Sequence, residues 1–255
     1  MHPLRRFLVL GLLTAGIGLL SQLASAIEFR QSTRQGYLVS NTVQKNTLAD
    51  IVQLVRTKTE FADRSIELNV GSGFVVGRYF ITVYHNLLAS RSRFVRQTVS
   101  VDGVALNPIF VDQNQDIAVF ELTDELCVRY CNNLKVAAAP TLERGRPVYW
   151  VRKIEAKWEL KESTILNLAV FDRVQSGVKP GSPFRCSDNL VVEIEEPFVP
   201  GSSGAPVVDA LTGQIIGVIQ GSFESNNQRT GYFKPIHCVG FRQALYAPRN
   251  SSSPG

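Results

Sequence analysis

The chain has 255 residues, of which 44% are hydrophobic and 19% are charged, the composition of an ordinary globular protein. Its formal net charge of +5 is too small and too scattered to indicate a nucleic-acid-binding protein. No segment repeats with a period of about 20–50 residues, which excludes a solenoid.

The first 26 residues have the pattern of a secretory signal peptide. Arg5 and Arg6 precede an apolar run from Phe7 to Leu20, and Ala24-Ser25-Ala26 follows as a cleavage site of the small-x-small type. This run is shorter than the roughly 20 residues that a membrane-spanning helix needs, so no stable membrane span is expected, with an uncleaved N-terminal anchor as the alternative. We therefore expect an exported protein, periplasmic or secreted after cleavage near Ala26, with a formal charge of +3 once the two arginines are removed.

The four cysteines indicate disulfide bonds, since an exported chain meets an oxidising compartment. Cys127, Cys131, Cys186 and Cys238 allow three connectivities. The first two are close enough to close a small loop, and pairing Cys186 with Cys238 would tie the segment before Ser203 to the end of the chain. Their spacing does not resemble a zinc site, and neither a metal nor a cofactor is expected.

The segments that follow predict a mostly β protein. Residues 27–64 are expected to form an N-terminal arm that contains a short helix from Thr47 to Val55, where the apolar residues have helical spacing. From residue 65 onward, short apolar or alternating runs are separated by turn residues, which is typical of an all-β sandwich or barrel. Val239 to Tyr246 is expected to be a short C-terminal helix, and residues 248–255 a flexible tail.

The segment with the most specific chemistry surrounds Ser203. In Pro200-Gly201-Ser202-Ser203-Gly204-Ala205-Pro206, a serine with glycines on both sides can lie in a tight turn with an exposed hydroxyl and free backbone N–H groups. Such N–H groups stabilise a tetrahedral oxyanion. An ordinary Gly/Ser turn is the alternative.

A nucleophilic serine needs a base, and histidine is the usual one. Of the three histidines, His2 leaves with the signal peptide, so His85 and His237 are the candidates. An acid must hold the tautomer of the base. Asp116 precedes the apolar run Ile117–Phe120, where a carboxylate is costly without a partner. Asp112 is the rival, in a more polar setting.

These segments resemble the trypsin-like serine peptidases with the chymotrypsin fold, and most closely the bacterial HtrA/Deg group. The order His, Asp, Ser is also that group's order. The resemblance covers roughly residues 65–245 and includes six motifs in the same order: Gly71-Ser72-Gly73-Phe74-Val75-Val76, Ile81-Thr82-Val83-Tyr84-His85-Asn86, Asp116-Ile117-Ala118-Val119, Gly201-Ser202-Ser203-Gly204-Ala205-Pro206, Gly213-Gln214-Ile215-Ile216-Gly217-Val218-Ile219 and Gly231-Tyr232-Phe233-Lys234-Pro235-Ile236.

The resemblance implies two six-stranded antiparallel β-barrels over residues 65–247, with a boundary near 135–145 and a site between them. His85, Asp116 and Ser203 would be catalytic, and the N–H groups of Gly201 and Ser203 would form the oxyanion hole. The strand from residue 219 would pair with a peptide substrate. The substrate-binding residues implied in this way are Pro197, Phe198, Ile219, Gln220, Gly221, Ser222 and Gly231.

The expected function is that of a serine endopeptidase acting on polypeptides, including unfolded proteins. Pro197 and Phe198 lie where the floor of the specificity pocket is expected, which favours cleavage after apolar residues, although the acids Glu195 and Glu196 are close in sequence. The chain departs from the group at Ser202, Ala205 and Tyr84, and no PDZ domain is expected after the peptidase domain.

Two other classes of protein remain as alternatives. One is a binding or scaffold protein that keeps the fold without useful turnover. The other is an esterase or lipase, which the absence of a G-x-S-x-G elbow disfavours. A dinucleotide-binding loop at Gly71-x-Gly73 is disfavoured because a strand-like run follows it, where such a loop opens a helix. The oligomeric state does not follow from the sequence.

Overall fold

The structure is a computed structural model, and it describes residues 50–132, 134, 136–138, 140–154, 157–170, 190–225 and 228–239. The chain divides into two units, Met1–Gln44 and Lys45–Gly255, and every described residue belongs to the second unit. The expected signal peptide, residues 240–246 of the expected C-terminal helix, the tail and Cys186 therefore lie outside the described residues. No helix in the described part of the chain is long and apolar enough to cross a membrane.

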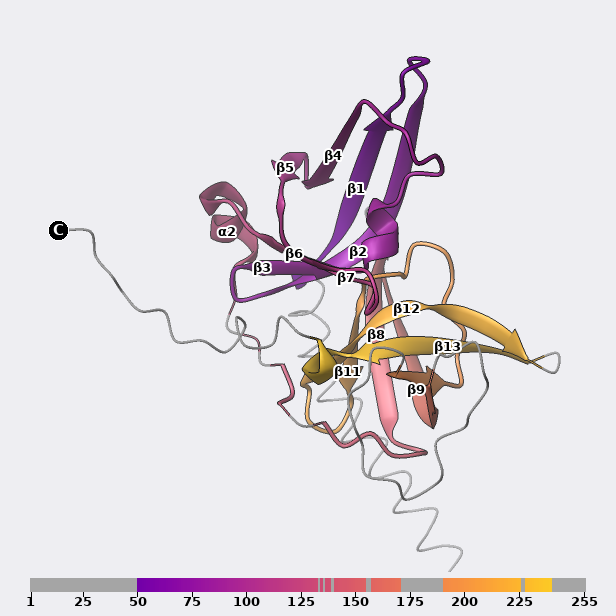
Figure 1. Cartoon of the computed structure of the whole chain (residues 1–255). Helices are drawn as coiled ribbons and strands as arrows, with labels where there is room; N and C mark the ends of the chain where they lie inside the picture. Colours follow the sequence, from indigo (N-terminus) through magenta and orange to yellow (C-terminus); the bar gives the residue numbers. More distant parts are fainter. Residues whose placement is uncertain are drawn as a thin grey trace, which may run out of the picture. The chain divides into compact units, whose positions relative to one another are not determined.

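The first half of the described chain forms a seven-stranded antiparallel sheet (Figure 1). In the order in which they lie side by side, its strands are β5 (Val104–Leu106), β4 (Arg96–Val101), β1 (Val52–Glu60), β2 (Ile66–Val76), β3 (Tyr79–Thr82), β7 (Ile117–Glu121) and β6 (Pro108–Asp112). The two outermost strands are joined by Asn107 alone, so the sheet must curl back on itself. Where one closed six-stranded barrel is expected, this half is a curled seven-stranded sheet, in which Asn107 separates β5 from β6.

Strand β1 corrects the expected N-terminal arm. Val52–Glu60 pairs with β2 on one side and β4 on the other, so these residues lie inside the peptidase fold. The expected helix from Thr47 to Val55 is wrong for residues 52–55, which are extended. Along β1, Val55, Thr57 and Thr59 are buried while Arg56 and Lys58 are exposed, an alternation that only a strand produces.

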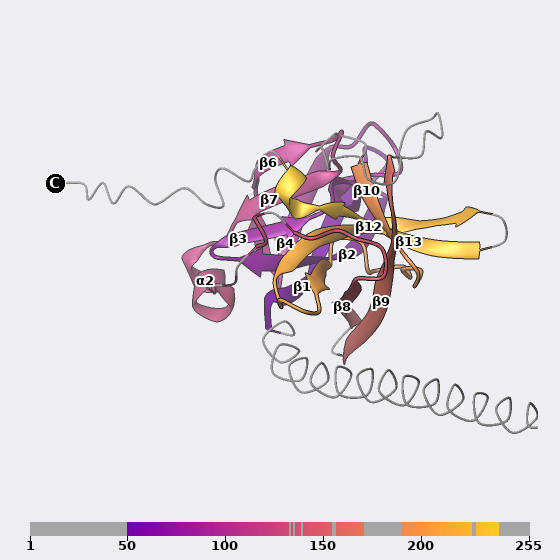
Figure 2. The same cartoon turned by 90° about the horizontal axis from the view of Figure 1, so that it is seen from below.

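The second half forms a closed six-stranded barrel, as expected. Its strands, in spatial order, are β10 (Leu190–Ile194), β13 (Gln228–Pro235), β12 (Ile215–Ser225), β11 (Pro206–Asp209), β8 (Pro147–Ile154) and β9 (Lys157–Val170). Figure 2 shows β12 and β13 as a paired ribbon. The core is apolar and includes Trp150, Ile165, Val192, Ile194, Phe198, Val207, Ile216, Ile219 and Phe233.

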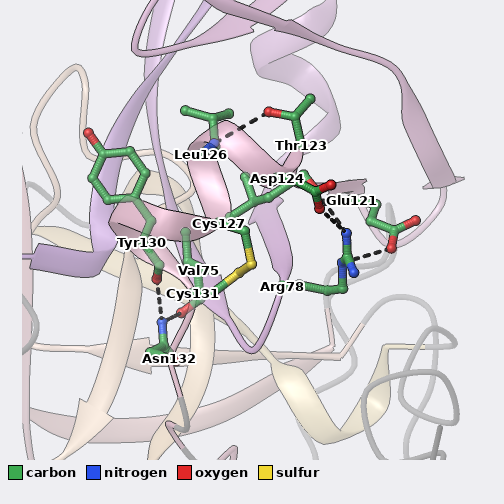
Figure 3. The surroundings of a disulfide bond; sticks show 11 residues. Val75, Arg78, Glu121, Thr123, Asp124, Leu126, Cys127, Tyr130, Cys131 and Asn132 are labelled. Carbon is green, nitrogen blue, oxygen red and sulfur yellow. Dashed lines mark hydrogen bonds and ion pairs between the residues drawn. A yellow bond between two sulfur atoms is a disulfide. The ribbon is translucent and has the colours of Figure 1, made fainter. Parts of the chain in front are cut away.

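Helix α2 (Asp124–Tyr130) follows the first sheet and is held at both ends (Figure 3). The Thr123 hydroxyl accepts the N–H of Leu126 at its start, and a disulfide joins Cys127 to Cys131 at its end. Cys238 is also disulfide-bonded, and the remaining cysteine, Cys186, lies outside the described residues. The described chain ends in the short 3-10 helix η2 (Ile236–Cys238) and Val239.

Candidate active site

His85 and Asp116 meet because the strands that carry them are neighbours. β3 is followed by the 3-10 helix η1 (Tyr84–Leu87), which holds His85, and Asp116 immediately precedes β7, the partner of β3. Asp116 Oδ2 lies 2.7 Å from His85 Nδ1, and Oδ1 accepts the backbone N–H of His85 at 2.8 Å. The contact favours the tautomer in which Nδ1–H donates to Oδ2, and in that tautomer Nε2 carries the lone pair.

The turn before β7 directs the Asp116 carboxylate toward His85. Asp116 has a φ of 55°, a left-handed conformation that Asp and Asn tolerate better than most residues. The rival acid, Asp112, uses Oδ1 to accept the N–H groups of Asn114 and Gln115 at 3.0 Å each. Asp112 therefore shapes the turn, and only Asp116 contacts the histidine.

The loop of Ser203 is a tight turn, as the sequence predicts. Gly201 and Gly204 have φ values of 86° and 91°. The Ser203 hydroxyl is half-buried and donates to the carbonyl of Gln220 at 3.4 Å. Within the described chain no hydrogen bond joins this hydroxyl to His85. The backbone N–H groups of Gly201 and Ser203 have no acceptor among the described residues, so both are free to meet an oxyanion.

Ser72 of β2 and Asn86 of η1 hold this loop. The N–H of Ser72 and the side-chain amide of Asn86 both donate to the Ser203 carbonyl, at 2.9 and 3.0 Å. The Ser72 hydroxyl donates to the Gly201 carbonyl at 2.6 Å. Neither Ser72 nor Asn86 was singled out from the sequence, although both lie within motifs of the resemblance. They bring the Ser203 loop to the same end of the sheet as His85.

At Gly204 the second half packs closely against the first sheet. A Cβ on this residue would lie 2.0 Å from the Ser72 carbonyl oxygen and 2.5 Å from Thr82 Oγ1. A glycine is therefore required both for its positive φ and for the space. Ala205, in contrast, is buried in the core and tolerates its methyl group.

Two of the residues expected to bind substrate, Ile219 and Gln220, lie on β12 next to the Ser203 loop. β12 pairs with β13 through a shift of register between Ile219 and Gly221, which leaves Gln220 without a partner residue. The Gln220 side chain donates to the Gln115 carbonyl at 2.7 Å, beside Asp116. Ile219 is fully buried, and its backbone bonds to the Ser203 loop through Gly204 and Ala205.

The other expected substrate-binding residues lie around Phe198. The Ser222 hydroxyl donates to the Phe198 carbonyl at 2.9 Å. The Phe198 ring is only 3% exposed and packs edge-on against Trp150 at 4.8 Å between centroids. A Cβ on Gly231 would lie 2.9 Å from this ring. Pro197 is half-buried beside it.

One further titratable group lies near the site. Burial, and secondly the negative charge of Asp116, raise the pKa of Tyr232 on β13 above its ordinary value. The hydroxyl of Tyr232 faces Gly221, where an added Cβ would be 3.1 Å from it. The rival base, His237, lies in η2 with Nε2 at 3.5 Å from Cys238 Sγ. No group of residues suited to a metal ion occurs among the described residues.

Comparison with known proteins agrees with this geometry. The sequence model of the trypsin-like peptidase domain matches residues 71–218, more than half of the chain. No curated protein matches the sequence. The structure is similar to the active form of the Rv3671c protease from M. tuberculosis, with a TM-score of 0.56 and 19% identity over 83% of this chain and 87% of that one. It is also similar to Deg5, with a TM-score of 0.54 and 19% identity over 77% and 88% of the two chains.

The family match covers the segment from the Gly71 motif through the Ser203 loop, and the structural matches extend the shared fold over both halves. The chain belongs to the family of trypsin-like peptidase domains, and it is a serine endopeptidase with the fold of the HtrA-like proteases.

Proposed function

We propose that Ser203, His85 and Asp116 form the catalytic triad of this endopeptidase. The observation that carries the assignment is the paired contact of Asp116 with the Nδ1 and the backbone N–H of His85. This contact fixes the one tautomer in which Nε2 can accept the proton of a serine hydroxyl. The proposal requires the Ser203 side chain to rotate away from the Gln220 carbonyl and toward His85 when substrate binds, since hydrogen bonds of a free site often tighten only with substrate.

The reaction then follows from these groups. Ser203 Oγ attacks the scissile carbonyl as its proton passes to His85, and the N–H groups of Gly201 and Ser203 stabilise the oxyanion. His85 gives the proton to the leaving amine, and a water molecule, deprotonated by His85, hydrolyses the acyl-enzyme. Asp116 stabilises the imidazolium that forms on His85.

A fluorophosphonate probe tests the assignment on the protein from residue 27 onward. We expect the probe to label the native protein and to fail on Ser203→Ala and His85→Ala. His237→Ala is the matched histidine control and should label normally. Labelling of Ser203→Ala would refute the nucleophile, and loss of labelling in a folded His237→Ala variant would transfer the role of base to His237.

A second candidate function is a binding protein with the same fold and little turnover. It is favoured by one observation, the direction of the Ser203 hydroxyl, which donates to Gln220 instead of His85. The same probe distinguishes the two functions, because a native protein that binds unfolded casein but neither reacts with the probe nor cleaves casein would be a binding protein.

We also propose that the enzyme is exported and acts on polypeptides outside the cytoplasm. The basic start, the apolar run and the Ala24-Ser25-Ala26 site support this location. Expression of the full chain should give a mature protein that begins near Ile27, as read by N-terminal sequencing of the exported fraction. A full-length protein that remains in the cytoplasm would contradict it.

A further inference from the structure

Gly201 is a part of the Ser203 loop that packing does not hold. A Cβ added to Gly201 would meet no described atom within 4 Å, whereas at Gly204 it would lie 2.0 Å from the Ser72 carbonyl oxygen. Gly201 also has a φ of 86°, in the left-handed region that glycine enters without steric cost. Hydrogen bonds, and not side-chain packing, must therefore fix the orientation of the Gly201 backbone.

Two hydrogen bonds hold the peptide group that joins Gly201 to Ser202. Its N–H, which belongs to Ser202, donates to the Val199 carbonyl at 3.1 Å. Its carbonyl, which belongs to Gly201, accepts the Ser72 hydroxyl at 2.6 Å. Because a trans peptide group is planar, bonds at its two opposite ends fix the orientation of the whole group. The first bond is local, and the second comes from another strand, β2.

Ser72 is itself held firmly enough to restrain its neighbour. Its side chain is fully buried. Its N–H donates to the Ser203 carbonyl at 2.9 Å, and its own carbonyl accepts Thr82 Oγ1 at 2.7 Å. The backbone of Ser72 is thus anchored on both sides, which fixes the place of its hydroxyl. No other side chain among the described residues bonds to the backbone of Gly201.

The Gly201 and Ser203 carbonyls differ in how many bonds hold them. The Ser203 carbonyl accepts two donors, the N–H of Ser72 and the side-chain amide of Asn86. The Gly201 carbonyl accepts one, the Ser72 hydroxyl. Since the N–H and the carbonyl of Gly201 share one Cα, a rotation that frees the carbonyl also turns the N–H. Loss of the hydroxyl should therefore disturb Gly201 more than Ser203.

We propose that Ser72 is a positioning residue whose hydroxyl keeps the N–H of Gly201 directed at the oxyanion. The inference rests on the proposed function, in which the N–H groups of Gly201 and Ser203 stabilise that oxyanion. Ser72 is fully buried and does not reach the substrate. Its hydroxyl therefore contributes to stabilisation of the transition state and not to binding of the substrate.

Ser72→Ala removes the hydroxyl and tests the proposal. We expect kcat for a peptide substrate to fall about 30-fold with little change in KM, less than the roughly 10²–10³-fold that loss of a whole oxyanion donor costs. Thr59→Val is the matched control, because Thr59 carries an equally buried hydroxyl of the first sheet, which accepts the Gln97 amide and does not contact the loop. It should keep the native kcat. A native kcat in Ser72→Ala would overturn the positioning role.

A pair of inhibitors separates this role from a merely structural one. A peptidyl aldehyde adds to the Ser203 hydroxyl and places its oxygen in the oxyanion hole, whereas the corresponding peptidyl alcohol binds without reacting. In Ser72→Ala we expect the Ki of the aldehyde to rise by about the factor by which kcat falls, and the Ki of the alcohol to stay unchanged. An equal rise for both inhibitors would show a general loss of structure and overturn the proposal.

Ser72→Cys provides the test if the alanine variant does not fold. A thiol is close in size to the hydroxyl but is a weak donor, so the core stays filled while the bond to the Gly201 carbonyl weakens. We expect kcat to fall severalfold in this variant, with the same difference between aldehyde and alcohol. A cysteine variant with the native kcat and the native aldehyde Ki would refute the positioning role.

Failure of the proposed function gives a different result. If the native protein neither reacts with the fluorophosphonate probe nor cleaves the peptide, the catalytic assignment is wrong. The amide NMR signal of Gly201 then tests the positioning by itself. We expect this signal to shift or broaden in Ser72→Ala and to stay in place in Thr59→Val. An unchanged Gly201 signal in Ser72→Ala would overturn the positioning role, whether or not the protein is active.

Discussion

The side-chain amide of Asn86 donates to the backbone carbonyl of Ser203 at 3.0 Å, so the residue next to the proposed base holds the loop of the proposed nucleophile. The same amide also donates to Thr82 Oγ1 at 3.0 Å, and Thr57 Oγ1 donates to the Asn86 carbonyl at 2.9 Å. Asn86 is therefore a positioning residue that links β1 and β3 to the second barrel. Its role leads to the first prediction.

Replacing Asn86 with Ala should lower the rate more than the stability. Loss of a hydrogen bond of this kind costs about 1 kcal/mol of folding free energy. The looser Ser203 loop should reduce kcat about tenfold with little change in KM, because the loss falls on the geometry of the reacting groups. Asn132→Ala is the control, since Asn132 also bonds a backbone carbonyl, that of Val75, but beside α2 (Figure 3). Equal kcat in both variants would refute the positioning role.

The sequence motifs indicate the proposed reactive residues but not the contacts that hold them. His85, Asp116 and Ser203 each lie in a recognisable motif, and the structure brings the first two into contact. The bonds of Ser72 and Asn86 to the Ser203 loop depend on how two sheets meet, which no local pattern encodes. The overall β fold, in contrast, could be predicted, because each motif is a local pattern and the order of the motifs along the chain resembles that of a known family.

Strand β1 was missed for a physical reason. Its buried face includes Thr57 and Thr59, both fully buried, so the apolar alternation that indicates a strand is hidden by polar residues. Thr57 is satisfied inside by the Asn86 carbonyl, a partner 29 residues away. The apolar residues from 48 to 55, read alone, fit helical spacing equally well.

Asp116 and Asp112 should respond differently to the same change. Asp116→Asn keeps the left-handed turn but presents the wrong group to His85 Nδ1, so turnover should fall by roughly 10⁴-fold. Asp112→Asn should have little effect, because an asparagine oxygen can still accept the N–H groups of Asn114 and Gln115. Peptide hydrolysis with circular dichroism as a check of folding measures both. A larger loss in Asp112→Asn would transfer the role of the acid to Asp112.

Gly204→Ala and Gly77→Ala separate backbone conformation from close packing. Both glycines have positive φ, 91° and 62°, so a side chain is strained at either one by about 1–3 kcal/mol. Only Gly204 lacks space, because nothing lies within 4 Å of a Cβ at Gly77. Gly77→Ala should lower the Tm by several degrees and keep its activity. Gly204→Ala should lose probe labelling entirely, and normal labelling would mean that Ser72 and the loop are free to separate.

The contact between Gly231 and Phe198 predicts the size of the residue after which the chain is cut. A Cβ on Gly231 would lie 2.9 Å from the Phe198 ring and 2.6 Å from the Glu196 carbonyl. The resemblance implies that these residues line the specificity pocket, and with such close packing we expect them to leave little room for a large side chain. The Phe198 ring itself is held in the core by Trp150. In a peptide library we expect cleavage after small apolar residues. Phe198→Leu should widen the pocket and improve the relative use of large apolar residues about tenfold.

The alternative to an apolar specificity pocket is one that contains the carboxylate of Glu195 or Glu196. A variant of Glu196 tests this alternative. Thr164 Oγ1 donates to the Glu195 carboxylate at 3.2 Å, which holds that acid against β9. Glu196 is half-buried, and its N–H donates to Ser163 Oγ at 2.9 Å. Dominant cleavage after Lys or Arg would contradict an apolar pocket and indicate the Glu196 carboxylate as its floor. In that case Glu196→Gln should abolish the preference for cleavage after Lys or Arg. If the pocket is apolar, the same variant should leave the pattern of cleavage in the peptide library unchanged.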